Sequence, residues 1–122
     1  MNNFKEFLSE TFFVIYGDNV TNLDLSKMLD FHRSKKTVGT LFVYRESLMN
    51  KDATPAIVAV KSDGEIFDII ERPVESDKER LEKIKPDQKY MNSGIYVLEP
   101  EVLDLIPSEG TSDFMLDIFP QV

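Results

Sequence analysis

Runs of apolar residues predict short strands that alternate with helices and turns. Residues 11–16 (TFFVIY) are apolar on both faces and end at Gly17-Asp18-Asn19, which is typical of a buried parallel strand and its C-terminal turn. Asp24 caps a predicted helix with apolar residues on one side, and Gly39 ends it. Residues 40–44 (TLFVY) form the next strand. A strand, a helix and a strand in this order indicate a parallel, right-handed crossover.

The second half of the chain predicts a hairpin and one longer strand. Residues 57–60 and 66–70 flank an Asp63-Gly64 pair, which supplies the backbone angles of a tight turn. Residues 74–89 are strongly charged and predict an exposed helix or loop. The remaining predicted elements are a helix over 3–9, a strand over 90–98 interrupted at Ser93-Gly94, a helix over 101–106 opened by Pro100, and a helical turn from Ser112 to Pro120. The predicted fold is α/β, with a mixed, partly Rossmann-like sheet and flanking helices.

Length and charge narrow the classes of function. A chain of 122 residues is one domain or a piece of a larger one, and we expect a single domain over 1–122. Its 22 acidic and 14 basic residues give a net charge of −8, which argues against a nucleic-acid partner. The absence of cysteine excludes disulfides and zinc sites built on sulfur. The pattern shows no signal peptide and no membrane span, so we expect a cytoplasmic protein without a membrane partner.

Asp18 is the first candidate for chemistry. It directly follows a predicted buried strand, at the edge of an α/β sheet where ligand crevices form. A single carboxylate in this position suits Mg²⁺, which takes oxygen ligands and usually only one or two from protein. The alternative is ordinary turn chemistry, in which Asp18 and Asn19 bind their own backbone.

Two further segments carry candidate ligand-binding residues. Glu71-Arg72-Pro73 follows a strand, and there Glu71 can accept two sugar hydroxyls while Arg72 holds a phosphate; an exposed ion pair is the alternative. Asn92 and Gly94 interrupt the strand over 90–98, which permits close approach of a ligand to the backbone; a β-bulge is the alternative.

His32 is the one histidine of the sequence, so it cannot form a histidine metal cluster. Its position near the end of a helix predicts a surface or packing role, because no partners for triad chemistry are evident. Asp18 and Glu71 also satisfy the residue types of a glycosidase acid and base, but that function depends on a separation in space.

Taken in order, five segments resemble the nucleotidyltransferases that join a nucleoside triphosphate to a sugar 1-phosphate and release pyrophosphate. The resemblance covers nearly the whole chain and is carried by FFVIYGDN at 12–19, NLDLSKMLDFHRSKK at 22–36, GEIFDIIERP at 64–73, MNSGIYVLEPEVLDLIP at 91–107 and SDFMLDIFP at 112–120. It implies a nucleotide-diphospho-sugar transferase-like fold, a role in nucleotide-sugar biosynthesis, and Mg²⁺, an NTP and a sugar 1-phosphate as cofactor and substrates.

The resemblance also assigns roles to single residues. Asp18 matches the aspartate that ligates the catalytic Mg²⁺, Glu71 the glutamate of a Glu-Lys-Pro motif that holds sugar hydroxyls, and Asn92 an asparagine that contacts the sugar. The family reaction is an in-line attack of the sugar phosphate on the α-phosphorus, helped by a metal and basic residues. It needs no covalent enzyme intermediate.

The sequence departs from the family in several places. Nothing in it resembles the glycine-rich GxGTRLxPxTxxxPK segment whose amides and basic side chains cradle the triphosphate, so we expect a truncated chain that is inactive by itself. Arg72 replaces the usual lysine, and Pro55-Ala56-Ile57 replaces a Tyr-Gly-Val type segment. The alternative is a non-catalytic sugar-phosphate-binding or interaction module. Because the missing segment contributes a central strand in the family, we expect a homo-oligomer formed through an exposed sheet edge.

Overall fold

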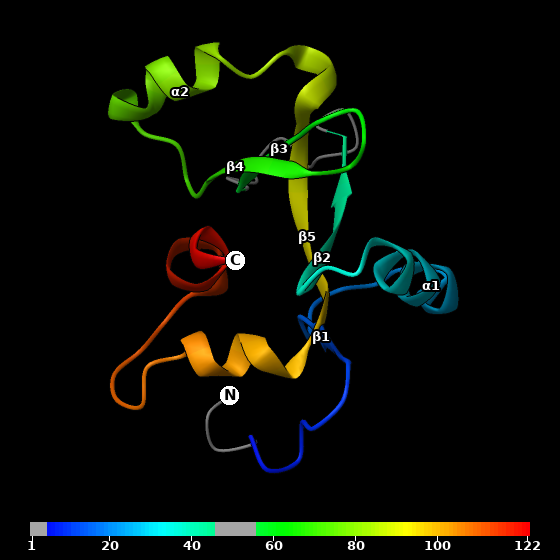
Figure 1. Ribbon diagram of the computed structural model, residues 1–122. Helices are drawn as coiled ribbons and strands as arrows, with labels where there is room; N and C mark the ends of the chain where they lie inside the picture. The colour runs from blue at the N-terminus through cyan, green and yellow to red at the C-terminus, as the bar shows by residue number, and fades with distance from the viewer. Residues whose placement is uncertain (1–4, 46–55) are drawn as a thin grey trace. The chain divides into compact units, whose positions relative to one another are not determined.

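The computed structural model describes residues 5–45 and 56–122 (Figure 1). The chain divides into two compact units, Met1–Phe42 with Ser93–Val122, and Val43–Asn92. Pairing links the strands in the order β1-β5-β3-β4, and β2 also pairs with β5. Helices and strands together confirm the α/β class, whereas the expectation of a single domain over 1–122 stays a prediction.

Both early strands of the first unit pair with the same late strand. β1 (Phe12–Ile15) runs antiparallel to the end of β5 (Lys89–Leu98), with Phe12 opposite Leu98 and Ile15 opposite Ile95. β2 (Gly39–Tyr44) also runs antiparallel to β5, because Glu99 N donates to Val38 O while Ser93 Oγ donates to Phe42 O. Because both run antiparallel to β5, β1 and β2 point in the same direction, as the crossover prediction requires, but each strand pairs with β5.

Helix α1 (Leu25–Lys35) forms where the sequence predicts it. The Asp24 side chain accepts a hydrogen bond from Lys27 N at 3.1 Å and so caps the first turn. The helix ends at Lys36, which adopts a left-handed conformation with φ 51°, and not at Gly39. Gly39 instead begins β2. A Cβ atom at this position would lie 3.2 Å from Leu98 Cδ2, so a glycine here allows close packing against Leu98.

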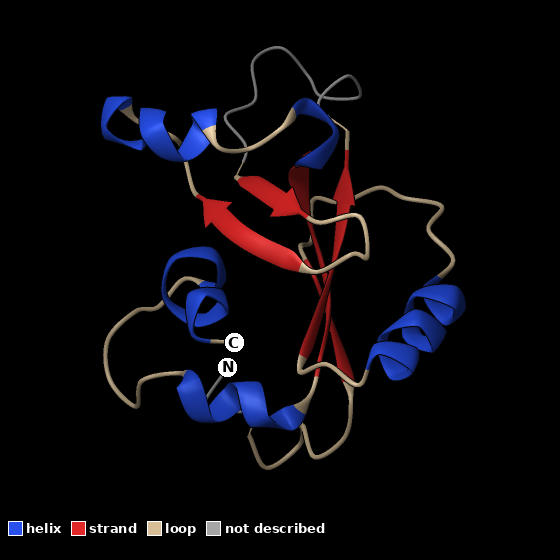
Figure 2. Ribbon diagram, turned by 45° about the horizontal axis from the view of Figure 1, so that its top comes forward, coloured by secondary structure: helices blue, strands red, loops and turns tan. Residues whose placement is uncertain are grey.

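Alternate residues of β5 face two cores in the first unit. Ile95 and Val97 pack against Met28 of α1, together with Phe13, Leu23, Leu29 and Phe42. Tyr96 faces the other way, toward the C-terminal segments η5 (Pro100–Leu105), η6 (Phe114–Ile118) and η7 (Phe119–Gln121). Figures 1 and 2 show α1 on one side of β1 and β5 and these segments on the other.

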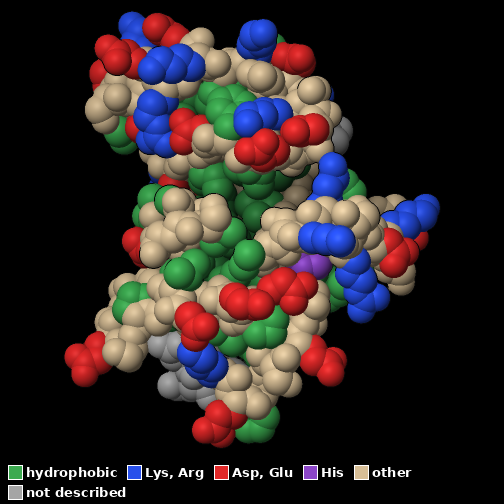
Figure 3. All heavy atoms as spheres, viewed as in Figure 1, with side chains coloured by type: hydrophobic (Ala, Val, Ile, Leu, Met, Phe, Trp, Pro, Cys, Tyr) green, Lys and Arg blue, Asp and Glu red, His purple; other side chains and the backbone are tan. Residues whose placement is uncertain are grey.

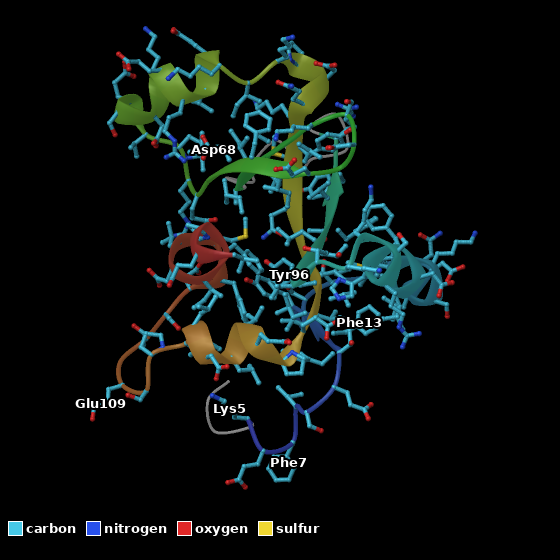
Figure 4. All side chains as sticks on the ribbon, viewed as in Figure 1. Lys5, Phe7, Phe13, Asp68, Tyr96 and Glu109 are labelled. Carbon is cyan, nitrogen blue, oxygen red and sulfur yellow. The ribbon has the colours of Figure 1, made fainter. Side chains whose placement is uncertain are left out.

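The two ends of the first unit differ from their predicted form. η5 begins at Pro100 as predicted but is a 3₁₀ helix, and η6 is capped by Asp113, whose Oδ1 accepts from Met115 N at 2.7 Å, not by Ser112. Residues 5–7 form a turn, so the predicted helix over 3–9 is wrong in its described part, while residues 3 and 4 lie outside it. Phe7 points outward with 78% of its surface exposed (Figure 4). The helical spacing of the apolar residues near it therefore does not place Phe7 in a core.

The second unit contains the predicted hairpin. β3 (Ile57–Val60) and β4 (Ile66–Ile70) are antiparallel, and Gly64 in the turn has φ 91°. β3 also pairs with the beginning of β5, where Ile57 lies opposite Met91.

The charged segment of the second unit folds into η3 (Glu75–Asp77), α2 (Lys78–Glu82) and η4 (Pro86–Gln88). Ile84 is buried and Leu81 half-buried, and both pack with the core of Ile57, Ala59, Ile70 and Met91. The segment is therefore less exposed than its charge predicts. Arg80 adds a bidentate ion pair to Asp68 of β4, the residue labelled in Figure 4.

Candidate functional site

Asp18 lies in a tight turn after β1. The turn is closed by a hydrogen bond from Asn19 N to Tyr16 O at 3.0 Å, and Tyr16 N donates to Gly94 O on β5, also at 3.0 Å. The Asp18 side chain is exposed and makes no hydrogen bond or ion pair within residues 5–45 and 56–122. The turn is closed by backbone atoms, and the Asp18 side chain does not bind its own backbone as that alternative predicts, so this carboxylate is open to solvent.

A carboxylate of this kind fits one ligand of a magnesium ion. Mg²⁺ commonly takes one or two protein carboxylates and completes its octahedron with water and phosphate oxygens. Among the described residues no group of three or more His, Asp or Glu side chains could hold a metal ion. Within the described residues, Asp18 therefore fits a magnesium ion that takes most of its ligands from water or a bound phosphate.

Glu71 and Arg72 form the turn that follows β4. Arg72 Nε lies 3.6 Å from Glu71 Oε1, so the predicted alternative of an ion pair is present. The pair is long and the Arg72 side chain is 80% exposed, whereas Glu71 is 19% exposed. An exposed pair of this geometry contributes little stability.

The backbone at Arg72 is the unusual feature of this turn. Its φ is 43°, in the left-handed region that a residue with a Cβ atom rarely adopts. Strain of this kind persists only where the surrounding structure holds it, and it gathers at binding sites. β4 ends at Ile70, so Glu71 lies just past the end of the strand as the sequence predicts, while Pro73 stands three residues beyond that end.

Asn92 and Gly94 lie within β5, which continues through them without the predicted interruption. Asn92 N donates to Ala56 O at 3.1 Å, so the backbone of Asn92 takes part in strand pairing. Gly94 has φ 76°, and a Cβ atom there would lie 2.8 Å from Tyr16 Cδ2 and 3.2 Å from Asn19 Nδ2. Packing under Tyr16 and Asn19 is thus a sufficient reason for glycine, and ligand contact at Gly94 stays a prediction.

The five predicted site residues belong to two groups. Asp18 and Gly94 are in the first unit, where the Asp18 turn rests on Gly94 through its neighbours. Glu71, Arg72 and Asn92 are in the second unit. Their roles as ligand contacts stay predictions.

Sequence reasoning missed a buried polar network around His32. His32 Nδ1 lies 2.8 Å from Thr40 Oγ1, and His32 Nε2 lies 2.8 Å from Glu99 Oε1. Thr11 Oγ1 also donates to Glu99, at 2.9 Å. The histidine is almost covered by other side chains in Figure 3, so the predicted packing role is confirmed and the surface role is wrong. No spacing in the sequence relates these residues, because 67 positions separate His32 from Glu99.

The network fixes the charge of Glu99. Burial by itself raises the pKa of the Glu99 carboxyl, but the hydrogen bonds from His32 and Thr11, with the charges of His32 and Arg33, outweigh it and lower that pKa below its ordinary value. Glu99 is therefore an ionised acceptor at neutral pH.

A groove of the first unit adjoins this network at the N-terminal end of β1, away from the Asp18 turn that follows the strand. Its charged and polar lining comprises Lys5, Ser9, Glu10, Thr11, Arg33, Glu99, Glu101 and Asp104. Opposite charges are mixed in it, and Lys5 is paired with Asp104. The groove therefore contributes nothing to a site at Asp18. No helix among the described residues is both long and apolar enough to cross a membrane.

The amino-acid sequence matches the nucleotidyl transferase family along residues 1–122. The chain belongs to this family. The resemblance carried by the five sequence segments is thereby confirmed. The α/β arrangement of a β-sheet with helices beside it is also consistent with a nucleotidyl transferase.

Several relatives are nucleotidyl transferases that differ in base and sugar. UTP–glucose-1-phosphate uridylyltransferase of Synechocystis is 30% identical over 98% of this chain and 28% of its own length. Mannose-1-phosphate guanylyltransferase 1 of Arabidopsis thaliana is 30% identical over 93% of this chain and 28% of its own length. Glucose-1-phosphate cytidylyltransferase of Salmonella typhimurium is 31% identical over 84% of this chain and 34% of its own length. The chain thus spans about a third or less of these relatives.

Proposed function

We propose that this chain carries the metal-binding and sugar-phosphate-binding part of a nucleotidyl transferase that acts on sugar 1-phosphates. The observation that supports it most is the exposed, unengaged carboxylate of Asp18 after β1, in a chain that matches the family throughout. The names of the relatives support a sugar 1-phosphate as the ligand class.

In this proposal the candidate residues supply three kinds of contact, to a metal ion, to the sugar and to a phosphate. Asp18 supplies one oxygen ligand to Mg²⁺, which neutralises phosphate charge when it is bound. In the second unit, Glu71 accepts hydrogen bonds from sugar hydroxyls and Asn92 adds an amide. Arg72, with its largely exposed side chain, binds a phosphate oxygen. Sugar and base remain open among mannose with guanine and glucose with uracil, thymine or cytosine.

The metal part of the proposal is tested with Mn²⁺ as a spectroscopic substitute for Mg²⁺. Electron paramagnetic resonance of free Mn²⁺ gives its affinity for the purified chain with and without glucose 1-phosphate. We expect binding that the sugar phosphate strengthens and that Asp18→Asn weakens by at least tenfold. Asp30→Asn, an exposed carboxylate on α1, is the matched control and leaves the affinity unchanged. Equal affinities for all three proteins would contradict the assignment of Asp18.

Turnover is a separate question from binding. The five glycines of the sequence stand far apart, and none forms a phosphate-cradling loop, so we propose that these 122 residues bind without catalysing transfer. A pyrophosphate-exchange assay with glucose or mannose 1-phosphate and the four NTPs then yields no product. Metal-dependent product that Asp18→Asn abolishes would overturn this part.

The exposed edge of β1 favours a second property, self-association. In the described part of the chain β1 pairs with β5 alone, its sequence FFVI holds no charge or proline, and Ile15 is 47% exposed. Such an edge accepts another strand. We propose a homo-oligomer through it, so that Ile15→Lys shifts the mass in sedimentation equilibrium toward the monomer. A wild-type monomer at high concentration would contradict it.

A further inference from the structure

The turn that carries Asp18 is attached to β5 where it begins and is closed by a hydrogen bond of its own. At its start, Tyr16 N donates to Gly94 O, and at its close, Asn19 N donates to Tyr16 O, each at 3.0 Å. Asp18 itself lies between these anchors and is exposed. The backbone position of Asp18 is thus set by where Tyr16 and Asn19 lie.

Both of those side chains rest on the bare backbone of Gly94. A Cβ atom at Gly94 would lie 2.8 Å from Cδ2 and 2.9 Å from Cγ of the Tyr16 ring, and 3.2 Å from Nδ2 of Asn19. Distances below 3.0 Å require a neighbour to move, and here the first neighbour is the ring of an aromatic residue. Any residue larger than glycine at position 94 therefore requires the Tyr16 side chain at the start of the turn to move.

The ring of Tyr16 contacts Tyr96, which in turn packs against aromatic residues of the C-terminal part of the chain. The Tyr16 and Tyr96 rings meet edge to face at 5.8 Å, and the Tyr96 hydroxyl donates to the Tyr16 hydroxyl at 3.3 Å. Tyr96 is fully buried, and its ring contacts Phe119 at 5.0 Å and Phe114 at 5.9 Å. Figure 4 labels Tyr96 on β5.

We infer that Tyr16, Tyr96, Phe114 and Phe119, here called the aromatic clasp, act with Gly94 as positioning residues for Asp18. The segment around η6 and η7 thereby sets the geometry of a metal ligand that it does not touch. Edge-to-face contacts and a buried hydroxyl fix ring orientation, and residues that orient a metal ligand strongly affect metal affinity. The inference rests on the proposed role of Asp18.

The test uses the full chain, labelled with ¹⁵N, and two readouts. The amide signals of Gly17, Asp18 and Asn19 report the turn without any metal, and Mn²⁺ affinity reports the function. We expect Gly94→Ala and Tyr16→Leu to move these amide signals and to weaken Mn²⁺ binding by about tenfold or more. The effect of Gly94→Ala is smaller in a Tyr16→Ala background, because the ring that the new methyl group meets is gone.

The matched control is Phe13→Leu, an aromatic residue of β1 that packs with the α1 core instead of the clasp. It leaves the three amide signals and the Mn²⁺ affinity close to wild type even if it lowers stability. Tyr96→Phe removes one oxygen, so it provides a milder shift should the larger substitutions fail to fold.

Each outcome decides between distinct claims. Unchanged amide signals in Gly94→Ala and Tyr16→Leu overturn the inference, and so do equal changes in Phe13→Leu. Moved signals in a protein whose Mn²⁺ affinity does not depend on Asp18 refute the metal assignment alone, while the clasp stands as the device that holds the turn.

Discussion

Glu99 is the residue on which the polar contacts of the first unit converge. It accepts hydrogen bonds from His32 and Thr11, and His32 in turn contacts Thr40. These four residues come from α1, β2 and the chain segments next to β1 and β5, so one buried network joins several elements.

Replacement of His32 tests the strength of this network. We expect His32→Leu to lower the free energy of unfolding by about 2 kcal/mol, because it leaves Thr40 and Glu99 without their shared partner in a buried setting. Urea denaturation measures this loss. Asp30→Ala, an exposed position on the same helix, changes stability by less than about 0.5 kcal/mol. Equal stability of His32→Leu and wild type would show that the network is dispensable.

The depressed pKa of Glu99 predicts a dependence of stability on pH. The folded-state pKa lies below the ordinary value of 4.5, so the stabilisation is complete above that value and is lost as the pH falls through the folded pKa. Glu99→Gln removes this contribution. The difference in unfolding free energy between wild type and Glu99→Gln then shrinks as the pH is lowered below about 4.5. A difference that is constant from pH 7 to pH 3 would contradict the assignment.

Single candidate residues were predictable where sequence order alone defines their position. Asp18 follows an apolar strand, and Glu71 lies between another strand and Pro73, so both residues lie at strand ends as expected. His32 was not predictable in its contacts, because Thr40 and Glu99 become its neighbours only when β2 and β5 pair. The need for glycine at position 94 was not predictable either, because it arises from contact with Tyr16, which lies 78 positions earlier in the chain.

At the scale of elements, the beginning of α1 was predictable from a local sequence signal, its capping residue Asp24. The Asp24 side chain accepts a hydrogen bond from Lys27 N, a backbone donor in the first turn that has no acceptor within the helix. We expect Asp24→Ala to cost about 1 kcal/mol of unfolding free energy in urea denaturation. Asp24→Asn, which keeps a side-chain oxygen acceptor, is the matched control and costs less. A loss of the same size in both variants would indicate that charge, not the cap, is responsible.

Element ends were less predictable than elements themselves. α1 ends at Lys36 in a left-handed conformation although Gly39 is nearby, because Gly39 is used for its contact with Leu98. β5 runs through Gly94 since pairing with β1 continues there. The apolar spacing near Phe7 predicted a helix that does not form, because spacing indicates a helix only when a core receives its apolar face.

At the scale of the whole molecule, the order of five sequence segments was enough to predict the family. The pairing of the strands was not, because β5 lies about 80 residues after β1 and antiparallel partners distant in sequence leave no local signal. The α/β class follows from the alternation of elements, whereas the sheet order depends on which strand satisfies the free edges of the others.

The central claim is that the chain binds a sugar 1-phosphate together with Mg²⁺ and that Asp18 and Glu71 each contribute to this binding. Isothermal titration with glucose 1-phosphate or mannose 1-phosphate, with and without Mg²⁺, tests it most directly. The account predicts binding that requires Mg²⁺ and that Asp18→Asn and Glu71→Gln each weaken by at least tenfold, while the exposed hairpin variant Glu65→Gln binds as wild type. Absence of binding, or binding that neither variant weakens, would contradict it.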